Sequence, residues 1–215
     1  MSRRMLITAG PTHEPIDRVR WIGNRSSGRV GRAVAEAAAD AGWAVTLLAG
    51  PGMHVPDDPG VTVERFETHA DLQRLLMAAW PEHDVLVMAA AVSDYRPANP
   101  IDGKQARGDT WTLELEATED LVALAAGQRR PGQRVIAFAL EAVDQLEARA
   151  REKLARKGVD AIVANPLNTI GDDQIEPVWM LADQSPLAPG LMTKADFGRW
   201  LVEQIGAQWP NEKEA

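Results

Sequence analysis

The sequence predicts an α/β fold of the doubly wound type, with a mostly parallel, Rossmann-like sheet. Short apolar runs alternate along the chain with segments of helical periodicity, which is typical of βα units. The run 84–90 is apolar after its first residue, Asp84, as expected of a strand buried on both faces of a parallel sheet. Turn residues separate the segments. We also expect a C-terminal hairpin and a protruding arm made of a loop and a strand.

The strands follow from the apolar runs. We expect parallel strands at 5–9, 44–48, 61–63, 84–90, 134–138 and 160–164. The period-two alternation of 110–116 predicts a half-exposed strand, and 177–182 is expected to belong to a terminal hairpin.

The helices follow from the 3.6-residue period and from end signals. We expect them at 28–41, 68–80, 121–127, 143–157 and 193–205. Thr68 with Asp71, and Thr193 with Asp196, have the spacing of capping boxes, and Gly158 is suited to a helix C-terminus. Residues 10–27 are expected to form a loop, and 209–215 a frayed tail.

The placement of the strands predicts where a ligand binds. In doubly wound sheets ligands lie beyond the carboxyl ends of the strands. The loops that follow residues 9, 90 and 138 should therefore share one functional rim.

Length and composition narrow the protein class. The 215 residues suit a single α/β domain over 1–215, and 45% hydrophobic with 25% charged residues exclude a disordered chain, a collagen and a coiled coil. No apolar run approaches the roughly 18 residues of a membrane span. We expect no signal peptide, because the few apolar residues before Gly10 are too short for its core. The absence of cysteine excludes thiolate chemistry and a disulfide framework. We expect a cytoplasmic protein that does not bind a membrane.

Charge is distributed unevenly. The net charge of −8 argues against a nucleic-acid binder. Residues 16–32 nevertheless hold five arginines against one aspartate, and residues 149–157 hold five cations against one glutamate. These segments are either solvated surfaces or sites reserved for an anionic ligand.

The segment 24–28 (NRSSG) leads directly into the first expected helix. Free amides and the dipole at a helix N-terminus bind phosphate, and Ser26, Ser27 and Gly28 allow a close approach. An ordinary serine cap is the alternative, and the neighbouring arginines favour the anion site. The dinucleotide G-x-G-x-x-G, P-loop and G-x-S-x-G motifs are absent, and the four histidines lack metal-ligand spacing, so no protein metal site is expected.

Four segments, in order, resemble the phosphopantothenoylcysteine synthetase family, the synthetase half of a bifunctional flavoprotein of coenzyme A biosynthesis. They are residues 7–29 (ITAGPTHEPIDRVRWIGNRSSGR), 88–98 (MAAAVSDYRPA), 136–141 (IAFALE), and 153–157 with 160–165 (KLARK, DAIVAN). The resemblance implies a ligase that joins 4′-phosphopantothenate to L-cysteine through an acyl-nucleotide intermediate. It implies CTP, or ATP, as co-substrate with Mg²⁺, and a homodimer. We expect no FMN and no decarboxylation, because the chain lacks cysteine and begins only a few residues before the first strand.

The resemblance also implies roles for individual residues. Asn24, Arg20 and Lys104 would be catalytic, and Arg20, Arg25 and Arg107 would bind the substrate phosphate. The residues that would bind the nucleotide are Gly10, Ser26, Ser27, Gly28, Ala90, Asp94, Phe138, Lys153 and Lys157. Residues 94–116 would form a lid over the intermediate and an arm across the dimer, with Trp111 as its apolar anchor.

Some positions depart from the family pattern. A lid motif of Lys-x-Lys-Lys becomes Lys104-Gln105-Ala106-Arg107, and Leu140 adds bulk near the nucleotide pocket. A weakly active or non-catalytic nucleotide-binding relative is therefore the alternative. A nicotinamide oxidoreductase is a further alternative, disfavoured by the missing glycine motif and by the lack of a lysine four residues after Tyr95.

Overall fold

A central sheet runs through the molecule in the strand order β12-β10-β9-β6-β1-β4-β5. The computed structural model describes residues 2–167 and 171–210. The strands are β1 (Arg4–Ala9), β4 (Ala44–Ala49), β5 (Val61–Arg65), β6 (Val85–Met88), β9 (Arg134–Glu141), β10 (Ala161–Pro166) and β12 (Val178–Leu181). All neighbours pair in parallel except β12, which is antiparallel to β10. The doubly wound, mostly parallel sheet is confirmed, and β12 is the second strand of the expected terminal hairpin.

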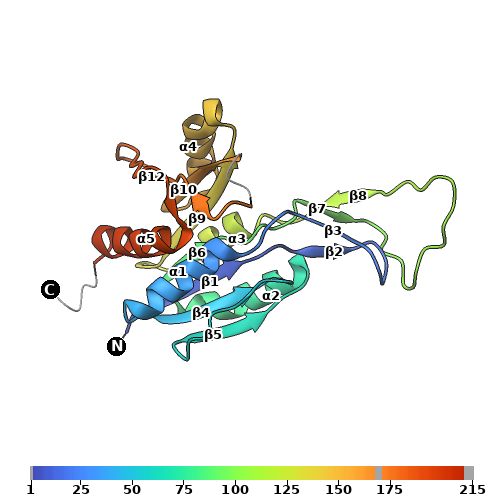
Figure 1. Cartoon of the computed structure of the whole chain (residues 1–215), viewed down its shortest axis with the longest axis horizontal. Coiled ribbons are helices and arrows are strands. Elements are labelled where there is room, and N and C mark those ends of the chain that lie inside the picture. The colour runs from blue at the N-terminus through green and yellow to red at the C-terminus, as the bar shows by residue number, and fades with distance from the viewer. Residues whose placement is uncertain (1, 168–170, 211–215) are drawn as a thin grey trace.

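Helices cover both faces of this sheet (Figure 1). The first face carries α1 (Arg29–Asp40) and α5 (Lys194–Gln208), and the second carries α2 (His69–Ala79), α3 (Leu121–Gly127) and α4 (Leu146–Lys157). Alternate side chains of a strand point to opposite faces, so Met5 and Ile7 pack beneath α1 whereas Leu6 packs beneath α2. Burying each such side chain stabilises the fold by roughly 1.5–3 kcal/mol.

Helix α5 packs tightly against α1. A Cβ atom at Gly198 would collide with the backbone of Ala33, so only glycine permits this approach. Phe197, Leu201 and Ile205 of α5 are fully buried in the same core. The C-terminal helix is therefore an integral layer of the domain.

The expected helix ends are largely confirmed. The Thr68 hydroxyl accepts from the Asp71 amide and the Asp71 carboxylate accepts from the Thr68 amide, which completes a capping box. The Thr193 hydroxyl caps α5 by accepting from the Asp196 amide, but the Asp196 carboxylate accepts from the Thr193 hydroxyl and not from its amide, so the expected capping box is only half formed. Gly158 ends α4 with φ +63°. One expectation is wrong at its start: residues 143–145 form the 3-10 turn η2 (Val143–Gln145), because Ala142 is extended and α4 begins only at Leu146.

An arm projects from the body (Figure 1). It combines the pair β2 (His13–Pro15) and β3 (Trp21–Gly23) with the pair β7 (Tyr95–Pro97) and β8 (Leu115–Ala117), and the connection 98–114 extends furthest. Two expectations are wrong here. Residues 10–27 are not only a loop, and of 110–116 only the end is a strand. Alternation predicts a strand only where a partner strand is available, and residues 110–114 have none.

The C-terminal region adds a small sheet of β11 (Gln174–Ile175) and β13 (Met192–Thr193). Trp209, expected to be frayed, packs edge-on against Trp179 with ring centroids 6.2 Å apart, and its carbonyl accepts from Arg3. The remainder of that expectation, 211–215, lies outside the described residues. Within residues 2–167 and 171–210, no helix has both the length and the apolarity needed to cross a membrane.

Candidate active site

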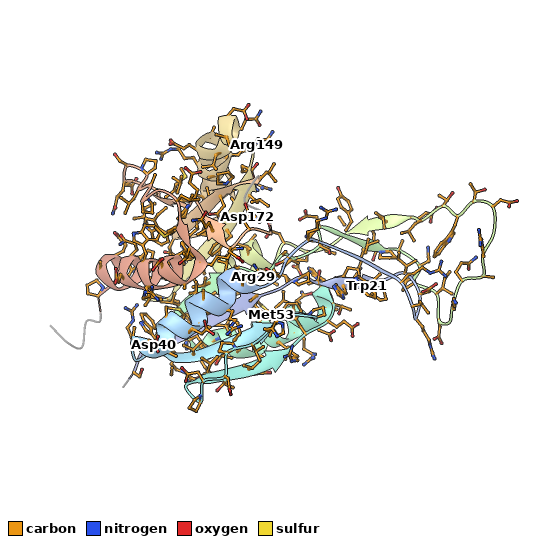
Figure 2. The ribbon with its side chains drawn as sticks, viewed as in Figure 1. Trp21, Arg29, Asp40, Met53, Arg149 and Asp172 are labelled. Atoms are coloured by element: carbon orange, nitrogen blue, oxygen red, sulfur yellow. The ribbon has the colours of Figure 1, made fainter. Side chains whose placement is uncertain are left out.

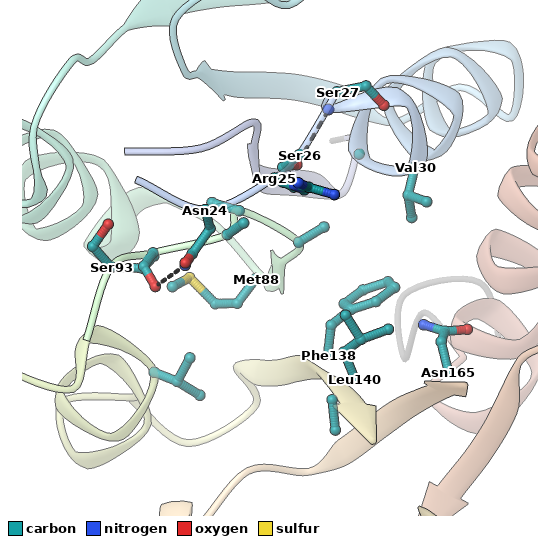
Figure 3. A pocket seen from close by; sticks show the side chains of 18 of the residues that line it. Asn24, Arg25, Ser26, Ser27, Val30, Met88, Ser93, Phe138, Leu140 and Asn165 are labelled. Atoms are coloured by element: carbon teal, nitrogen blue, oxygen red, sulfur yellow. Dashed lines mark hydrogen bonds between the residues drawn. The ribbon is translucent and has the colours of Figure 1, made fainter. Parts of the chain in front are cut away.

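A cavity of about 810 Å³ opens at the carboxyl edge of the sheet. Its walls come from the start of α1, the loop after β6, the start of α3, and the ends of β9 and β10 (Figure 3). The strand order reverses between β1 and β6, which is where ligands bind in such sheets. The predicted site residues that line it are Asn24, Arg25, Ser26, Ser27, Gly28, Ala90, Asp94, Phe138 and Lys157.

The N-terminus of α1 forms one wall of the cavity. Gly28 is the N-cap with φ +70°, and no side-chain hydrogen bond caps this helix in the part of the chain described. The Ser26 hydroxyl instead accepts from the Gly28 amide at 3.3 Å (Figure 3). The first-turn amides therefore face the cavity without a capping side chain, and together with the helix dipole they favour an anion.

Asn24 joins the two central loops. Its Nδ2 donates to the Val92 carbonyl at 2.9 Å. The loop after β6 is held in turn by the buried pair Thr12 and Ser93: their hydroxyls lie 3.0 Å apart, and the Ser93 amide donates to the Thr12 hydroxyl at 3.0 Å. Thr118 donates to the Ser93 carbonyl at 2.7 Å. These bonds fix Asn24 against a rigid support.

The lysines of α4 are paired with carboxylates. Lys157 lines the cavity and lies 3.0 Å from Asp120, the N-cap of α3. Lys153 lies 2.5 Å from Glu141 and is not among the lining residues of the described chain. Burial opposes ionisation of Asp120, but hydrogen bonds from the Ala123 amide and the Lys157 ammonium outweigh it and lower its pKa.

A second group of predicted residues lies on the arm. Arg20, Lys104 and Arg107 border a separate, open hollow of about 730 Å³. Arg20 lies 2.7 Å from the Asp17 carboxylate, donates to the Gln105 carbonyl at 2.7 Å, and stacks over Trp111. The structure therefore divides most of the predicted site residues between the cavity and the arm, and does not bring Lys104 to Asn24 within one chain.

Gly10 belongs to neither group in the described part of the chain. Its φ is +86°, and a Cβ atom there would lie 3.1 Å from the backbone of Gly50. Close packing behind the cavity accounts for this glycine.

Sequence comparison agrees with this geometry. A family model described as "DNA/pantothenate metabolism flavoprotein C-terminal domain" matches residues 1–208. The chain belongs to this family.

Several known proteins are similar in sequence to most of this chain. The Mycobacterium tuberculosis coenzyme A biosynthesis bifunctional protein CoaBC is 40% identical over 195 residues, 84% of this chain and 46% of that protein. A cysteine/cysteine sulfinic acid decarboxylase from an unknown prokaryotic organism is 41% identical over 170 residues, 79% of this chain and 47% of that protein. The chain thus spans about half the length of the curated relatives it matches. The crystal structure of the C-terminal domain of a CoaBC protein has a TM-score of 0.81 and 32% identity, covering 96% of this chain and 95% of that one.

Several lining residues were not predicted as site residues. Asn165 is the penultimate residue of the buried strand β10, and Gln174 and Lys194 come from the C-terminal region. Burial and the Arg29 guanidinium lower the pKa of Lys194. Asn165 lies in the segment 160–165, which resembles the family, and near the carboxyl end of a strand. These two signals could have identified it as a site residue. Gln174 and Lys194 carry no comparable signal.

Proposed function

We propose that the chain is a phosphopantothenate–cysteine ligase that uses CTP. The carboxylate of 4′-phosphopantothenate would attack the α-phosphate and release pyrophosphate, and the amine of cysteine would then displace CMP to form the amide. The observation that carries this proposal is a single cavity of about 810 Å³ that joins Asn24, the open N-terminus of α1, and Lys157. Its volume lies within the roughly 300–1,000 Å³ typical of small-molecule sites.

The chain's own groups suit the charges of this reaction. A phosphorylated acid must approach a triphosphate, and their repulsion is large in a site of low dielectric unless cations and amides offset it. The α1 amides, Arg25 and Lys157 would supply that compensation. Asn24 would donate to the oxygen on which charge develops during acyl transfer.

Mg²⁺ would enter bound to the triphosphate. Among the described residues no group of three or more acidic or histidine side chains is placed to hold a metal ion. Triphosphate oxygens are suitable Mg²⁺ ligands, and the ion would neutralise charge on the leaving pyrophosphate. We propose no role for FMN.

The arm supports a homodimer in which one chain completes the site of the other. Lys104 and Arg107 are exposed and lie outside the cavity. The arm also exposes large apolar side chains, with Trp21 and Tyr95 55% and 57% exposed. Figure 2 shows Trp21 on the arm side of the body. Contact between two arms would cover these side chains and bring the lid cations of one chain near the cavity of its partner.

The alternative, a non-catalytic or weakly active nucleotide-binding relative, keeps the same cavity with little or no turnover. Ala106 and Arg107 replace two lysines of the family lid, and Leu140 lines the cavity. Both hypotheses predict nucleotide binding, so binding alone does not distinguish them.

The test is pyrophosphate release with phosphopantothenate and either CTP or ATP, each with and without cysteine. Release with CTP, followed by a cysteine-dependent amide product, supports the ligase. Nucleotide binding without pyrophosphate release supports the inactive relative. The absence of both contradicts the proposal.

A further inference from the structure

Asn165 is an exception in an apolar strand. The four preceding residues of β10, 161–164, are apolar and at most 1% exposed. Asn165 is itself only 7% exposed, and its Oδ1 has no hydrogen-bond partner among the described residues. Such a group costs about 1–3 kcal/mol of stability, whereas an apolar side chain of similar size would not.

A second buried amide shows how this fold satisfies one that is structural. Gln133 is 5% exposed, and its Nε2 donates to the Trp80 and His83 carbonyls at 3.0 and 2.6 Å. Its Oε1 accepts from the Arg130 amide at 2.7 Å. Because buried polar groups are nearly always paired in this way, Asn165 needs a reason outside the folded chain.

The location of Asn165 supplies that reason. It lines the cavity and pairs in register with Leu140 of β9, two residues beyond Phe138. Figure 3 shows Phe138, Leu140 and Asn165 grouped on one wall, away from Arg25, Ser26 and Ser27 at the anion-binding wall. The amide group of Asn165 lies beside the Phe138 side chain in this view.

We propose that Asn165 reads the base of the nucleotide, with Phe138 packing against the base. An amide offers one donor and one acceptor side by side, which matches the paired donor and acceptor on the edge of a nucleobase. An aromatic ring adds a stacking surface for the base. With phosphates at the α1 wall and the base at the Phe138 wall, one nucleotide would span the cavity. This inference rests on the proposed function.

The test compares Asn165→Leu with the unchanged protein by calorimetric titration of CTP, UTP, ATP and tripolyphosphate, each with Mg²⁺. We expect about tenfold weaker binding of the preferred nucleotide, because the base loses its hydrogen bonds. Tripolyphosphate, which has no base, should bind equally to both proteins. The thermal unfolding midpoint should stay the same or rise. Asn165→Asp keeps the shape of the side chain but removes its hydrogen-bond donor, and it should weaken binding of the same nucleotide. This variant carries the test if the leucine variant fails to fold.

Gln133→Leu is the matched control. It should lower the unfolding midpoint because it unpairs three buried backbone groups, and it should leave nucleotide affinity unchanged. Equal nucleotide binding by the Asn165 variants and the unchanged protein would overturn the inference. The inference would also be overturned if the Asn165 variants bound tripolyphosphate as much more weakly as they bind the nucleotide, or if they lost only phosphopantothenate binding. Failure of the unchanged protein to bind any nucleotide would instead remove the proposed function itself.

Discussion

The Asp17 carboxylate accepts a hydrogen bond from the backbone amide of Gln105 at 3.0 Å, across 88 residues of sequence. It also accepts from the amides of Val19 and Arg20, both at 2.8 Å. One buried carboxylate thereby ties the β2–β3 connection to the loop that carries Lys104. We therefore expect the position of this loop to depend on Asp17 more than on the exposed ion pair of Arg18 and Asp102.

Replacing Asp17 by Asn should loosen the arm while the body stays folded. A neutral amide accepts these hydrogen bonds more weakly than a charged carboxylate does. The substitution also leaves Arg20 without its carboxylate partner. We expect trypsin to cleave after Lys104 and Arg107 at least several-fold faster, with little change in far-ultraviolet circular dichroism. Asp102→Asn is the control, because Asp102 forms only an exposed pair with Arg18. Equal cleavage of both variants would show that Asp17 does not anchor the loop.

The ionisation of Asp17 gives a pH prediction. Burial alone would raise the pKa of Asp17, but the amides of Val19, Gln105 and Arg20 and the Arg20 guanidinium lower it to about 2. The folded-state pKa lies below the unfolded value of about 3.9, so the anchor is fully present above about pH 4 and is lost as pH falls through about 2. A carbon-13 NMR titration of the carboxyl groups should find Asp17 still ionised at about pH 3. A midpoint near the unperturbed value would contradict the prediction.

Replacing Asn24 by Asp should impair amide formation more than acyl-nucleotide formation. The carboxylate loses the donor that now meets Val92, and its charge opposes the charge that develops on the acyl oxygen. Loss of one such donor typically costs about 10²–10³ in rate. Rapid-quench measurement of pyrophosphate and of amide product separates the two steps. A proportionate loss of both would remove this role from Asn24.

Replacing Lys104 by Gln should reduce the overall rate about tenfold or more without changing stability, because the side chain is exposed and electrostatic catalysis depends on its charge. Mixing this variant with Asn24→Asp tests the site shared between two chains. If arms act across the dimer, mixed dimers should regain part of the activity. If activity does not recover once the subunits have exchanged, both residues belong to the site of a single chain. A monomer at working concentration would also contradict the shared site.

Replacing Gly28 by Ala should destabilise the fold by about 1–2 kcal/mol, because a side chain at φ +70° is strained. The added Cβ would also lie 2.8 Å from Met53 Sδ. Gly206→Ala is the matched control in the interior of α5, where nothing lies within 4 Å. It should be neutral or stabilise by up to about 1 kcal/mol, since alanine favours helix. Urea unfolding of both variants measures the difference.

The order of strands and helices was predictable because each buried strand and amphipathic helix carries its own period. The run 84–90, of which 85–88 form the buried strand β6, and the Thr68 cap are examples. The arm was harder to predict, since β8 depends on β7, which lies eighteen residues earlier and has no period of its own. Gathering Asn24 and Phe138 into one cavity followed from the rule for strand ends, whereas Lys157 was predicted only from the family resemblance. Asn165 was missed because an unpaired amide becomes evident only when its surroundings are known.

The Gly198 contact has a consequence for how this unit can be cut from or joined to other chains. The last strand of the central sheet ends at Leu181, which invites a boundary there. A chain that ended at that point would lack α5, so the apolar face of α1 would be exposed to solvent and the cavity would lose the wall that contains Lys194. Fusions should therefore be tolerated after Trp209, whereas shortening into α5 should yield aggregation-prone protein even though every strand of the central sheet remains.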